Sequence, residues 1–195
     1  MNKLFLKDNI LSIDFLKEVL KSESNIDQFN LKFNKFGKPY IENKNIYFNI
    51  SHDENKTAIV ISDKEVGVDI EYLTYNEAVL KKAFNEKEIR KIKESTDPKY
   101  EFTKMWVMKE AYVKMLGIGL SYGLKNVDTT KLENKIKIIN KKEFLVAICE
   151  KENGWKYEHY VLRRCKYSWW LSYICVINLK TWKRNNKHIS FKHGL

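Results

Sequence analysis

The 195-residue sequence has few of the residues that break or crosslink a chain. It contains only 7 glycines and 2 prolines, which argues against a loop-rich or low-complexity protein. Its 3 cysteines are widely spaced and form no CxxC motif, so neither a disulfide framework nor a zinc site is expected. Reduced thiols of this kind are typical of a cytoplasmic protein.

Long apolar runs are also missing. The N-terminal stretch from Met1 to Leu16 is interrupted by Lys7, Asp8 and Asp14, so it has no apolar core of signal-peptide length. Nowhere does the sequence approach the roughly 20 apolar residues of a membrane-spanning helix. We therefore predict a cytoplasmic protein without a membrane anchor.

Acidic residues are outnumbered by basic ones, 25 against 36, and the net charge is +11. This excess indicates an anionic partner, which is a nucleic acid, a phosphorylated ligand, an acidic protein or a membrane surface. Charge alone does not choose among them. Apolar residues make up 44% of the chain, enough for the hydrophobic core of one domain or of two small lobes.

The predicted elements follow the order helix, strands, helices, strands, which indicates an α+β fold. A helix is predicted over 12–21 with Ser12 as N-cap, followed by a three-stranded antiparallel meander over 46–72. Helices are predicted over 76–95, with a break near Asn85, and from Asp97-Pro98 to a stop at Gly117. The remaining predicted elements are strands at 135–139, 143–149, 155–162 and 169–179 and a basic tail at 180–195.

The stretch EVGVDIEY at residues 65–72 alternates apolar residues with Gly67, Asp69 and Glu71. Two carboxylates therefore share one face of a strand, where like charges repel each other. A strand turning a polar edge to water is the ordinary explanation. A divalent-cation site is the functional one, because Mg²⁺ prefers carboxylate oxygens, and Gly67 would then let a ligand approach the backbone.

On the helix that begins at Pro98, Trp106, Glu110 and Lys114 are spaced i, i+4, i+8 and share one face. A Glu–Lys pair at this spacing is common and stabilises a helix by only about 0.3–0.5 kcal/mol. The functional interpretation makes Glu110 a third metal carboxylate and Lys114 a phosphate-binding cation.

The strand FNISH at residues 48–52 ends in Ser51 and His52. Adjacent strand residues point to opposite faces, so the two side chains do not form a hydrolase dyad. No Gly-x-Ser-x-Gly elbow occurs either, which excludes a serine hydrolase of that type. Both side chains can donate to phosphate oxygens.

Four motifs occur in a specific order: GKP at 37–39, FNISH at 48–52, VGVDIE at 66–71 and WVMKEAYVKMLGIGLS at 106–121. In this order they resemble the Sfp-type 4′-phosphopantetheinyl transferases. The resemblance implies an α+β fold of two pseudo-symmetric α/β lobes with the coenzyme A (CoA) site between them. It also implies Mg²⁺-dependent transfer of the phosphopantetheine arm of CoA to a serine of an apo acyl or peptidyl carrier protein, which releases adenosine 3′,5′-bisphosphate.

The resemblance assigns metal binding to Asp69, Glu71 and Glu110. It assigns catalysis to Glu110, Lys114 and Asp69, with Lys114 contacting the pyrophosphate and Glu110 helping to deprotonate the serine. These residues match the carboxylates and the cation that were selected above from their spacing.

The resemblance assigns the phosphates of CoA to Lys38, Ser51, His52 and Lys114. It implies an acidic carrier protein, in keeping with the positive charge of the chain, and a monomer that binds no nucleic acid or membrane. Three residues are implied to support the site, one as an acid near the metal and two on the helix: Glu88, Trp106 and Lys109.

Two departures from the family pattern stand out. The N-terminal lobe, predicted as 1–67 against 68–195 for the C-terminal lobe, is expected to lack a first strand, a helix and a basic segment that bind the adenosine 3′-phosphate. CoA is then held more weakly, or Lys32 and Lys35 substitute. Asp53 also lies beside the phosphate site, where an acid is unfavourable unless it is paired or points away.

Three alternatives remain open. A degenerate family member would bind CoA or metal without catalysis. An RNA-binding protein would suit the basic, aromatic-rich composition, but no RNP-type strand is present. A Mg²⁺-dependent nuclease would use clustered acids and a lysine, but it would not explain the Gly-Lys-Pro and Ser-His elements.

Overall fold

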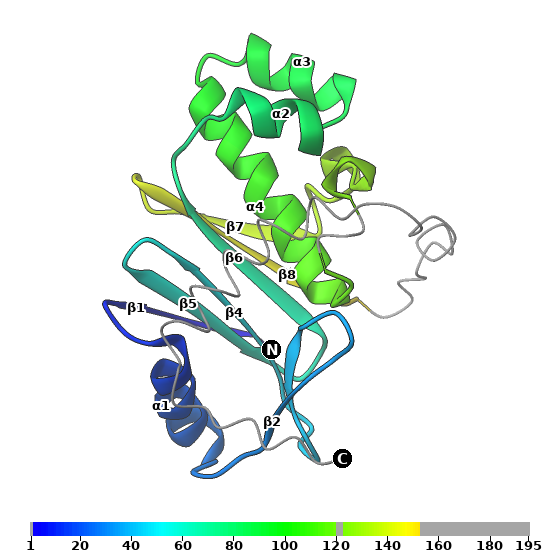
Figure 1. Ribbon diagram of the computed structural model, residues 1–195. Helices are drawn as coiled ribbons and strands as arrows, with labels where there is room; N and C mark the ends of the chain where they lie inside the picture. Colours follow the sequence, from blue (N-terminus) through cyan, green and yellow to red (C-terminus); the bar gives the residue numbers. More distant parts are fainter. Residues whose placement is uncertain (1, 120–122, 153–195) are drawn as a thin grey trace.

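The computed structural model describes residues 2–119 and 123–152, and these form an α+β fold (Figure 1). The predicted α+β class is therefore confirmed. The strands predicted over 155–162 and 169–179 and the basic tail at 180–195 lie outside the described residues. Within 2–119 and 123–152, no helix has both the length and the apolar character of a membrane span.

Two three-stranded antiparallel sheets have the same topology. In each sheet, the strand that comes last in the sequence lies in the middle and pairs with the other two. The first sheet has the order β1-β5-β4, with β1 at Lys3–Asp8, β4 at Tyr47–Asp53 and β5 at Lys56–Ser62. The second has the order β6-β8-β7, with β6 at Val66–Tyr72, β7 at Ile136–Asn140 and β8 at Phe144–Glu150.

Helices follow the first strand in both halves. The first half has α1 at Ser12–Ser24, and the second has α2 at Glu77–Ala83, α3 at Glu86–Glu94 and α4 at Pro98–Leu116. A separate hairpin of β2, Leu31–Phe33, and β3, Pro39–Ile41, lies between α1 and β4. Each half is thus a strand, a helical segment and a two-stranded hairpin, in keeping with the pseudo-symmetry that the resemblance implied.

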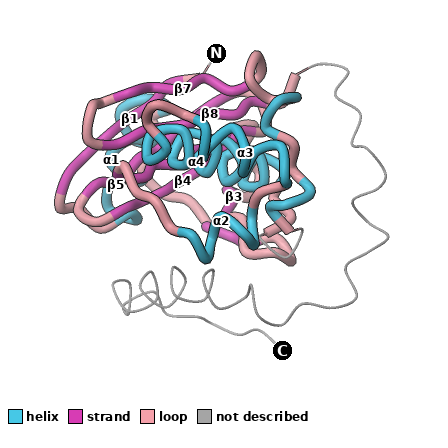
Figure 2. The backbone as a smooth tube through the Cα atoms, turned by 90° about the horizontal axis from the view of Figure 1, so that it is seen from above, coloured by secondary structure: helices cyan, strands magenta, loops and turns pink. Residues whose placement is uncertain are grey.

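The helices cover the outer faces of the two sheets, and the inner faces pack on each other. The buried side of α1 meets Phe48 and Ile59 of the first sheet, while α4 lies along β6 and β8. Between the sheets, Val60 of β5 packs in one apolar cluster with Val68 of β6 and Val146 of β8. Figures 1 and 2 show α2 and α3 gathered at the N-terminal end of α4.

Local signals set the ends of the helices, as the sequence predicted with one exception. Asn85 forms a capping box at the break between α2 and α3, and Asp97 caps α4 at Tyr100 N, ahead of Pro98. Gly117 ends α4 in the left-handed conformation, with φ of 63°. Ser12, however, is the first residue of α1 and not its N-cap, and no side chain caps that helix.

The predicted meander over 46–72 is wrong in its third strand. β6 does not pair with β5 but crosses into the second sheet, where Asp69 lies opposite Ala147 of β8. From this position its apolar side chains pack in the core between the sheets. At the free edge of β6, backbone amides donate instead to side chains of β4. Val68 N donates to Asn49 Oδ1 at 2.9 Å, and Tyr72 N donates to Asp53 Oδ2 at 2.8 Å.

Strand β1 is absent from the sequence prediction, and its presence corrects the expectation that no strand precedes the first helix. Its residues do not alternate cleanly, because Leu4 packs toward the core between the sheets while Phe5 packs toward α1. A strand with apolar contacts on both faces lacks the period-two pattern that a sequence search needs.

Gly67 serves helix packing and not ligand access, which corrects the role expected from the sequence. A Cβ atom built at Gly67 would lie 2.1 Å from the carbonyl oxygen of Ala111 and 2.3 Å from the amide nitrogen of Met115. Both atoms belong to the α4 backbone, which cannot rotate away as a side chain can. The missing side chain therefore allows α4 to lie directly on β6.

We predict that Gly67→Ala lowers the free energy of unfolding by about 3 kcal/mol, the upper end of the usual cost of overpacking, because helix and strand must separate. Gly37→Ala is the control: its Cβ meets nothing within 4 Å, so only its positive φ contributes, at about 1–2 kcal/mol. Urea denaturation measures both. Equal losses for the two variants would contradict the packing role of Gly67.

Candidate functional site

A pocket of about 260 Å³ opens between the first sheet, the β2–β3 hairpin and α4. Residues from both halves of the chain line it. Every site residue that the sequence selected for metal binding, catalysis or phosphate binding is among them: Lys38, Ser51, His52, Asp69, Glu71, Glu110 and Lys114. The structure therefore brings together side chains that are up to 76 positions apart (114 − 38) in the sequence.

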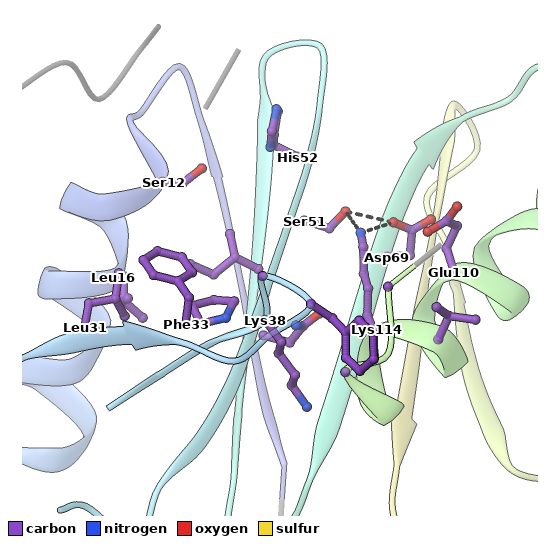
Figure 3. A pocket seen from close by; sticks show the side chains of 18 of the residues that line it. Ser12, Leu16, Leu31, Phe33, Lys38, Ser51, His52, Asp69, Glu110 and Lys114 are labelled. Atoms are coloured by element: carbon purple, nitrogen blue, oxygen red, sulfur yellow. Dashed lines mark hydrogen bonds and ion pairs between the residues drawn. The ribbon is translucent and has the colours of Figure 1, made fainter. Parts of the chain in front are cut away.

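Asp69 of β6 is the centre of the polar wall. Lys114 Nζ donates to Asp69 Oδ1 at 2.6 Å and to Ser51 Oγ at 2.8 Å, and Ser51 Oγ donates to the same Asp69 oxygen at 2.8 Å (Figure 3). Three elements, β4, β6 and α4, thus supply one hydrogen-bonded group. The i+4 spacing on α4 places Glu110 one turn before Lys114, and Figure 3 shows its carboxylate beside that of Asp69.

Glu71 lies two residues after Asp69 on the same face of β6, and it is held by the helix. Trp106 Nε1 donates to Glu71 Oε1 at 3.1 Å. This hydrogen bond is the contact through which Trp106 supports the site. The ring of Trp106 stacks in turn on Phe102, with an interplanar angle of 4°. This aromatic packing fixes the orientation of the indole N–H that Glu71 accepts.

Burial works against ionisation of all three carboxyl groups, and its effect is clearest for the two glutamates. It raises the pKa of Glu71 to about 9, with the charges of Asp69 and Asp53 adding to the effect and the Trp106 hydrogen bond opposing it. Burial, followed by the charge of Asp69, raises the pKa of Glu110 to about 8. At neutral pH without a bound cation, both glutamates therefore keep their protons.

Lys114 and Asp69 form the charged pair of the wall. Desolvation works against the charge on Lys114, but Asp69 and Glu110 outweigh it, and the pKa of Lys114 is raised. Burial acts on Asp69 to raise its pKa, while Lys114 opposes that effect. Because the ammonium donates to Asp69 at 2.6 Å, we assign Asp69 as the ionised carboxylate of the three.

The donor set suits a hard cation that arrives with further oxygen ligands. Asp69 Oδ2 is buried and has no hydrogen-bond partner among the described residues. In the same part of the chain, no three His, Cys, Asp or Glu side chains are gathered closely enough to hold a metal ion as they stand. Mg²⁺ needs no such cage, since it commonly takes one or two carboxylates and completes its shell with phosphate and water oxygens. The residues present therefore fit Mg²⁺ bound together with a phosphate ligand.

The remaining phosphate-binding candidates differ in how free they are. His52 lies apart from the Ser51–Asp69–Lys114 group in Figure 3, and burial, aided by the charge of Lys114, lowers its pKa. Lys38 lines the pocket, but its ammonium donates to Glu65 Oε2 at 2.6 Å and to the carbonyl of Met115 at 2.8 Å. A phosphate contact would require Lys38 to leave these partners.

Three expectations about neighbouring charges are now settled or changed. Asp53 accepts a hydrogen bond from the amide of Tyr72 and does not line the pocket, but its charge still acts on Glu71. Lys32 is ion-paired with Glu42, and Lys35 lies over the ring of Phe36, 4.9 Å from its centroid. Neither lysine lines the pocket. Their positions therefore do not support the expectation that they replace the missing basic segment in binding the adenosine 3′-phosphate.

Glu88 does not line the pocket, contrary to the role near the metal that the resemblance implied. It is buried in a separate network, where Lys109 Nζ donates to its Oε2 at 2.8 Å and the amide and hydroxyl of Thr129 donate to its Oε1. Lys109 also donates to the carbonyl of Leu124 at 3.0 Å. The pair thus ties α3 and α4 to the segment after residue 122, and the supporting role of Lys109 acquires a physical basis.

The sequence did not indicate the apolar half of the pocket, which α1 and the β2–β3 hairpin supply. Ile50 of β4 adds to this apolar lining, whose members share only an apolar side chain: Ile13, Leu16, Leu31, Phe33, Phe36, Pro39 and Ile50. Phe33 and Phe36 are each more than a third exposed, and exposed aromatic side chains are typical of binding surfaces, but this signal comes from the structure and not from the sequence.

Comparisons with known proteins agree with this geometry. A family model described as the 4′-phosphopantetheinyl transferase superfamily matches residues 65–175, more than half of the 195-residue chain. The matched region begins at the start of β6 and includes Asp69, Glu71, Glu110 and Lys114.

Several curated relatives carry the same name or one that includes it. The chain is 30% identical over 135 residues to the 4′-phosphopantetheinyl transferase gsp of Aneurinibacillus migulanus, which is 66% of this chain and 56% of that protein. It is 32% identical over 94 residues to psf-1 of Bacillus pumilus, 46% of this chain and 40% of that protein. Against the L-aminoadipate-semialdehyde dehydrogenase-phosphopantetheinyl transferase of Saccharomyces cerevisiae, identity is 34% over 113 residues, 50% of this chain and 42% of that protein. The chain thus spans about half the length of these relatives.

We predict that, without metal, Glu71→Gln has a higher free energy of unfolding than the parent, and that this difference grows as the pH rises from 5 to 9. The unfolded chain releases the Glu71 proton near its ordinary pKa of 4.5, whereas the folded chain keeps it to about 9. Stability from this group is therefore lost with rising pH across that window, by at most about 1.4 kcal/mol per pH unit.

Glutamine removes the titration and can still accept from Trp106 Nε1. Urea unfolding in EDTA at several pH values measures the effect. The exposed Glu94→Gln is the control, and its stability difference from the parent should stay constant. A constant difference for Glu71→Gln as well would show that Glu71 is not held in its neutral form.

Proposed function

The chain belongs to the 4′-phosphopantetheinyl transferase superfamily, and we propose that it transfers the phosphopantetheine arm of CoA to a serine of an apo carrier protein. One observation carries the proposal: Asp69, Glu71, Glu110 and Lys114 converge on one wall of one pocket from two different elements, β6 and α4. The names of the relatives support the same reaction class.

In the proposed reaction the serine hydroxyl oxygen forms a bond to the β-phosphorus of CoA. The bond between that phosphorus and the bridging pyrophosphate oxygen breaks, and adenosine 3′,5′-bisphosphate leaves with the electron pair. The serine proton passes to Glu110 or to a water that Glu110 orients. Glu110 can accept it only as a carboxylate, so its raised pKa favours catalysis at mildly alkaline pH or with a cation bound beside it.

The positive charge needed by a pyrophosphate comes from Lys114 and from a proposed metal site. One or two carboxylates from the group of Asp69, Glu71 and Glu110 would hold Mg²⁺ together with phosphate and water oxygens. When bound, the ion would neutralise charge on the pyrophosphate and its leaving group. Lys114 contributes a fixed ammonium on the same wall, 2.6 Å from Asp69. Ser51 holds both groups in place through its hydroxyl.

The rest of the pocket suits the other parts of the donor. The apolar wall from α1 and the hairpin offers surface to an adenine ring or to the pantetheine chain. The net charge of +11 favours encounter with both CoA and an acidic acyl or peptidyl carrier protein. A monomer acting in the cytoplasm, as inferred from the sequence, completes the proposal.

We predict that Glu110→Gln lowers the rate of carrier modification by about 10²–10⁴-fold, the usual contribution of one general base, while the protein stays folded. The assay incubates the protein with CoA, Mg²⁺ and an apo carrier protein and follows the mass of the carrier. The exposed Glu94→Gln is the matched control and should keep the parental rate.

Two results would contradict the proposal in different ways. Equal rates for Glu110→Gln and the parent would remove Glu110 from the active site. A parent that binds CoA in isothermal titration but never modifies any acyl or peptidyl carrier would favour the degenerate family member over the transferase.

A further inference from the structure

The β2–β3 hairpin forms one wall of the pocket without belonging to either main sheet. Its two strands pair only with each other among the described strands. Nevertheless it carries Phe33, Phe36 and Pro39 into the lining of the pocket that Lys114 of α4 also lines. Something other than backbone pairing must therefore fix the distance between this wall and the helix.

Asn34 at the tip of the hairpin makes contacts in two directions. Its Oδ1 accepts from the amides of Phe36 and Lys38, both at 2.9 Å, and so closes the turn between the strands. Its Nδ2 donates to the carbonyl oxygen of Gly117 at 2.8 Å, 83 positions further along the chain. Both polar atoms of the side-chain amide therefore form hydrogen bonds.

The partner of Asn34 is the end of α4, where helix carbonyls lack intrahelical partners. Gly117 ends the helix in the left-handed conformation, and a Cβ built there would lie 3.0 Å from Asn34 Nδ2 and 2.8 Å from Lys38 Cδ. Lys38 Nζ donates to the carbonyl of Met115 in the same turn. The hairpin thus caps the C-terminus of α4 directly after Lys114.

We propose that Asn34 is a positioning residue that ties the hairpin wall of the pocket to the last turn of α4. We call its hydrogen bond from Nδ2 to the carbonyl oxygen of Gly117 the latch. The latch holds the aromatic rim at a fixed distance from Lys114 and keeps the pocket preformed for its ligand. Asn34 itself does not line the pocket, so it acts on binding and not on the reacting atoms. The effect on CoA binding rests on the proposed function, whereas the mechanical role of the latch does not.

Two substitutions separate the latch from the turn. Asn34→Asp keeps an oxygen for the amides of Phe36 and Lys38 but places a second oxygen against the Gly117 carbonyl. Asn34→Ser can still close the turn through its hydroxyl, but it is too short to reach Gly117 and adds no charge that would repel CoA. Lys32→Gln is the control, because it breaks the exposed ion pair with Glu42 on the same hairpin and leaves the latch intact.

Hydrogen exchange followed by mass spectrometry tests the latch without a ligand. We expect faster exchange in peptides covering 31–41 and 113–119 for both Asn34 variants, and parental exchange for Lys32→Gln. Unchanged exchange in these peptides would overturn the proposal. So would an equal increase in α1 and β8, since that would indicate general destabilisation.

Titration and steady-state kinetics with CoA and an apo carrier test the consequence. Asn34→Ser should bind CoA about 3- to 10-fold more weakly, the effect of losing one neutral hydrogen bond, and Asn34→Asp should lose at least as much because it also adds a negative charge. In both variants KM should rise and kcat should stay within about twofold of the parent. A lowered kcat with unchanged KM would overturn the positioning role. If the parent itself binds no CoA, the proposed function fails, and the exchange data alone decide on the latch.

Discussion

The ion pair between Lys114 and Asp69 is the interaction on which the site depends. Three carboxyl groups lie on one partly dehydrated wall, and an isolated buried charge there would be strongly unfavourable. The ammonium 2.6 Å from Asp69 allows one of them to ionise, and the resulting negative charge helps to keep Glu71 and Glu110 protonated. Together with burial, the pair thus decides which carboxyl group of the wall carries a charge.

That pair exists only because α4 lies directly on β6, and the sheet containing β6 in turn lies against the sheet of β4. Gly67 permits the first contact by its missing side chain. The second is made by alternate residues of β4, since Asn49, Ser51 and Asp53 each hydrogen-bond to β6. The site is therefore part of the junction between the two halves of the molecule, and it cannot be assembled by either half alone.

The sequence was informative wherever the deciding interactions are local. Asp97, Pro98 and Gly117 determine the ends of α4 through contacts within one or two turns, and a 3.6-residue period places Trp106, Glu110 and Lys114 on one face. Together with the family resemblance, these patterns predicted the polar wall of the pocket.

Contacts between distant stretches of the chain could not be predicted from sequence patterns. The pairing of β6 with β8 joins residues 66–72 to residues 144–150, and no local pattern distinguishes it from pairing with β5. The burial of Glu88 with Lys109 and the capping of α4 by Asn34 and Lys38 depend on the same kind of distant contact. Residue type identified Lys38 as a cation but could not show that its ammonium already has partners.

The order in which the strands pair also has a consequence for synthesis of the protein. All the strands of the first sheet lie within residues 3–62, so that sheet can form while the ribosome is still making the rest. Strand β6 carries Asp69 but has no sheet partner until β8 emerges, almost 80 residues after β6 begins (144 − 66 = 78). The binding wall is therefore expected to be among the last described parts of the molecule to form. Until then the nascent chain exposes the inner face of a finished sheet.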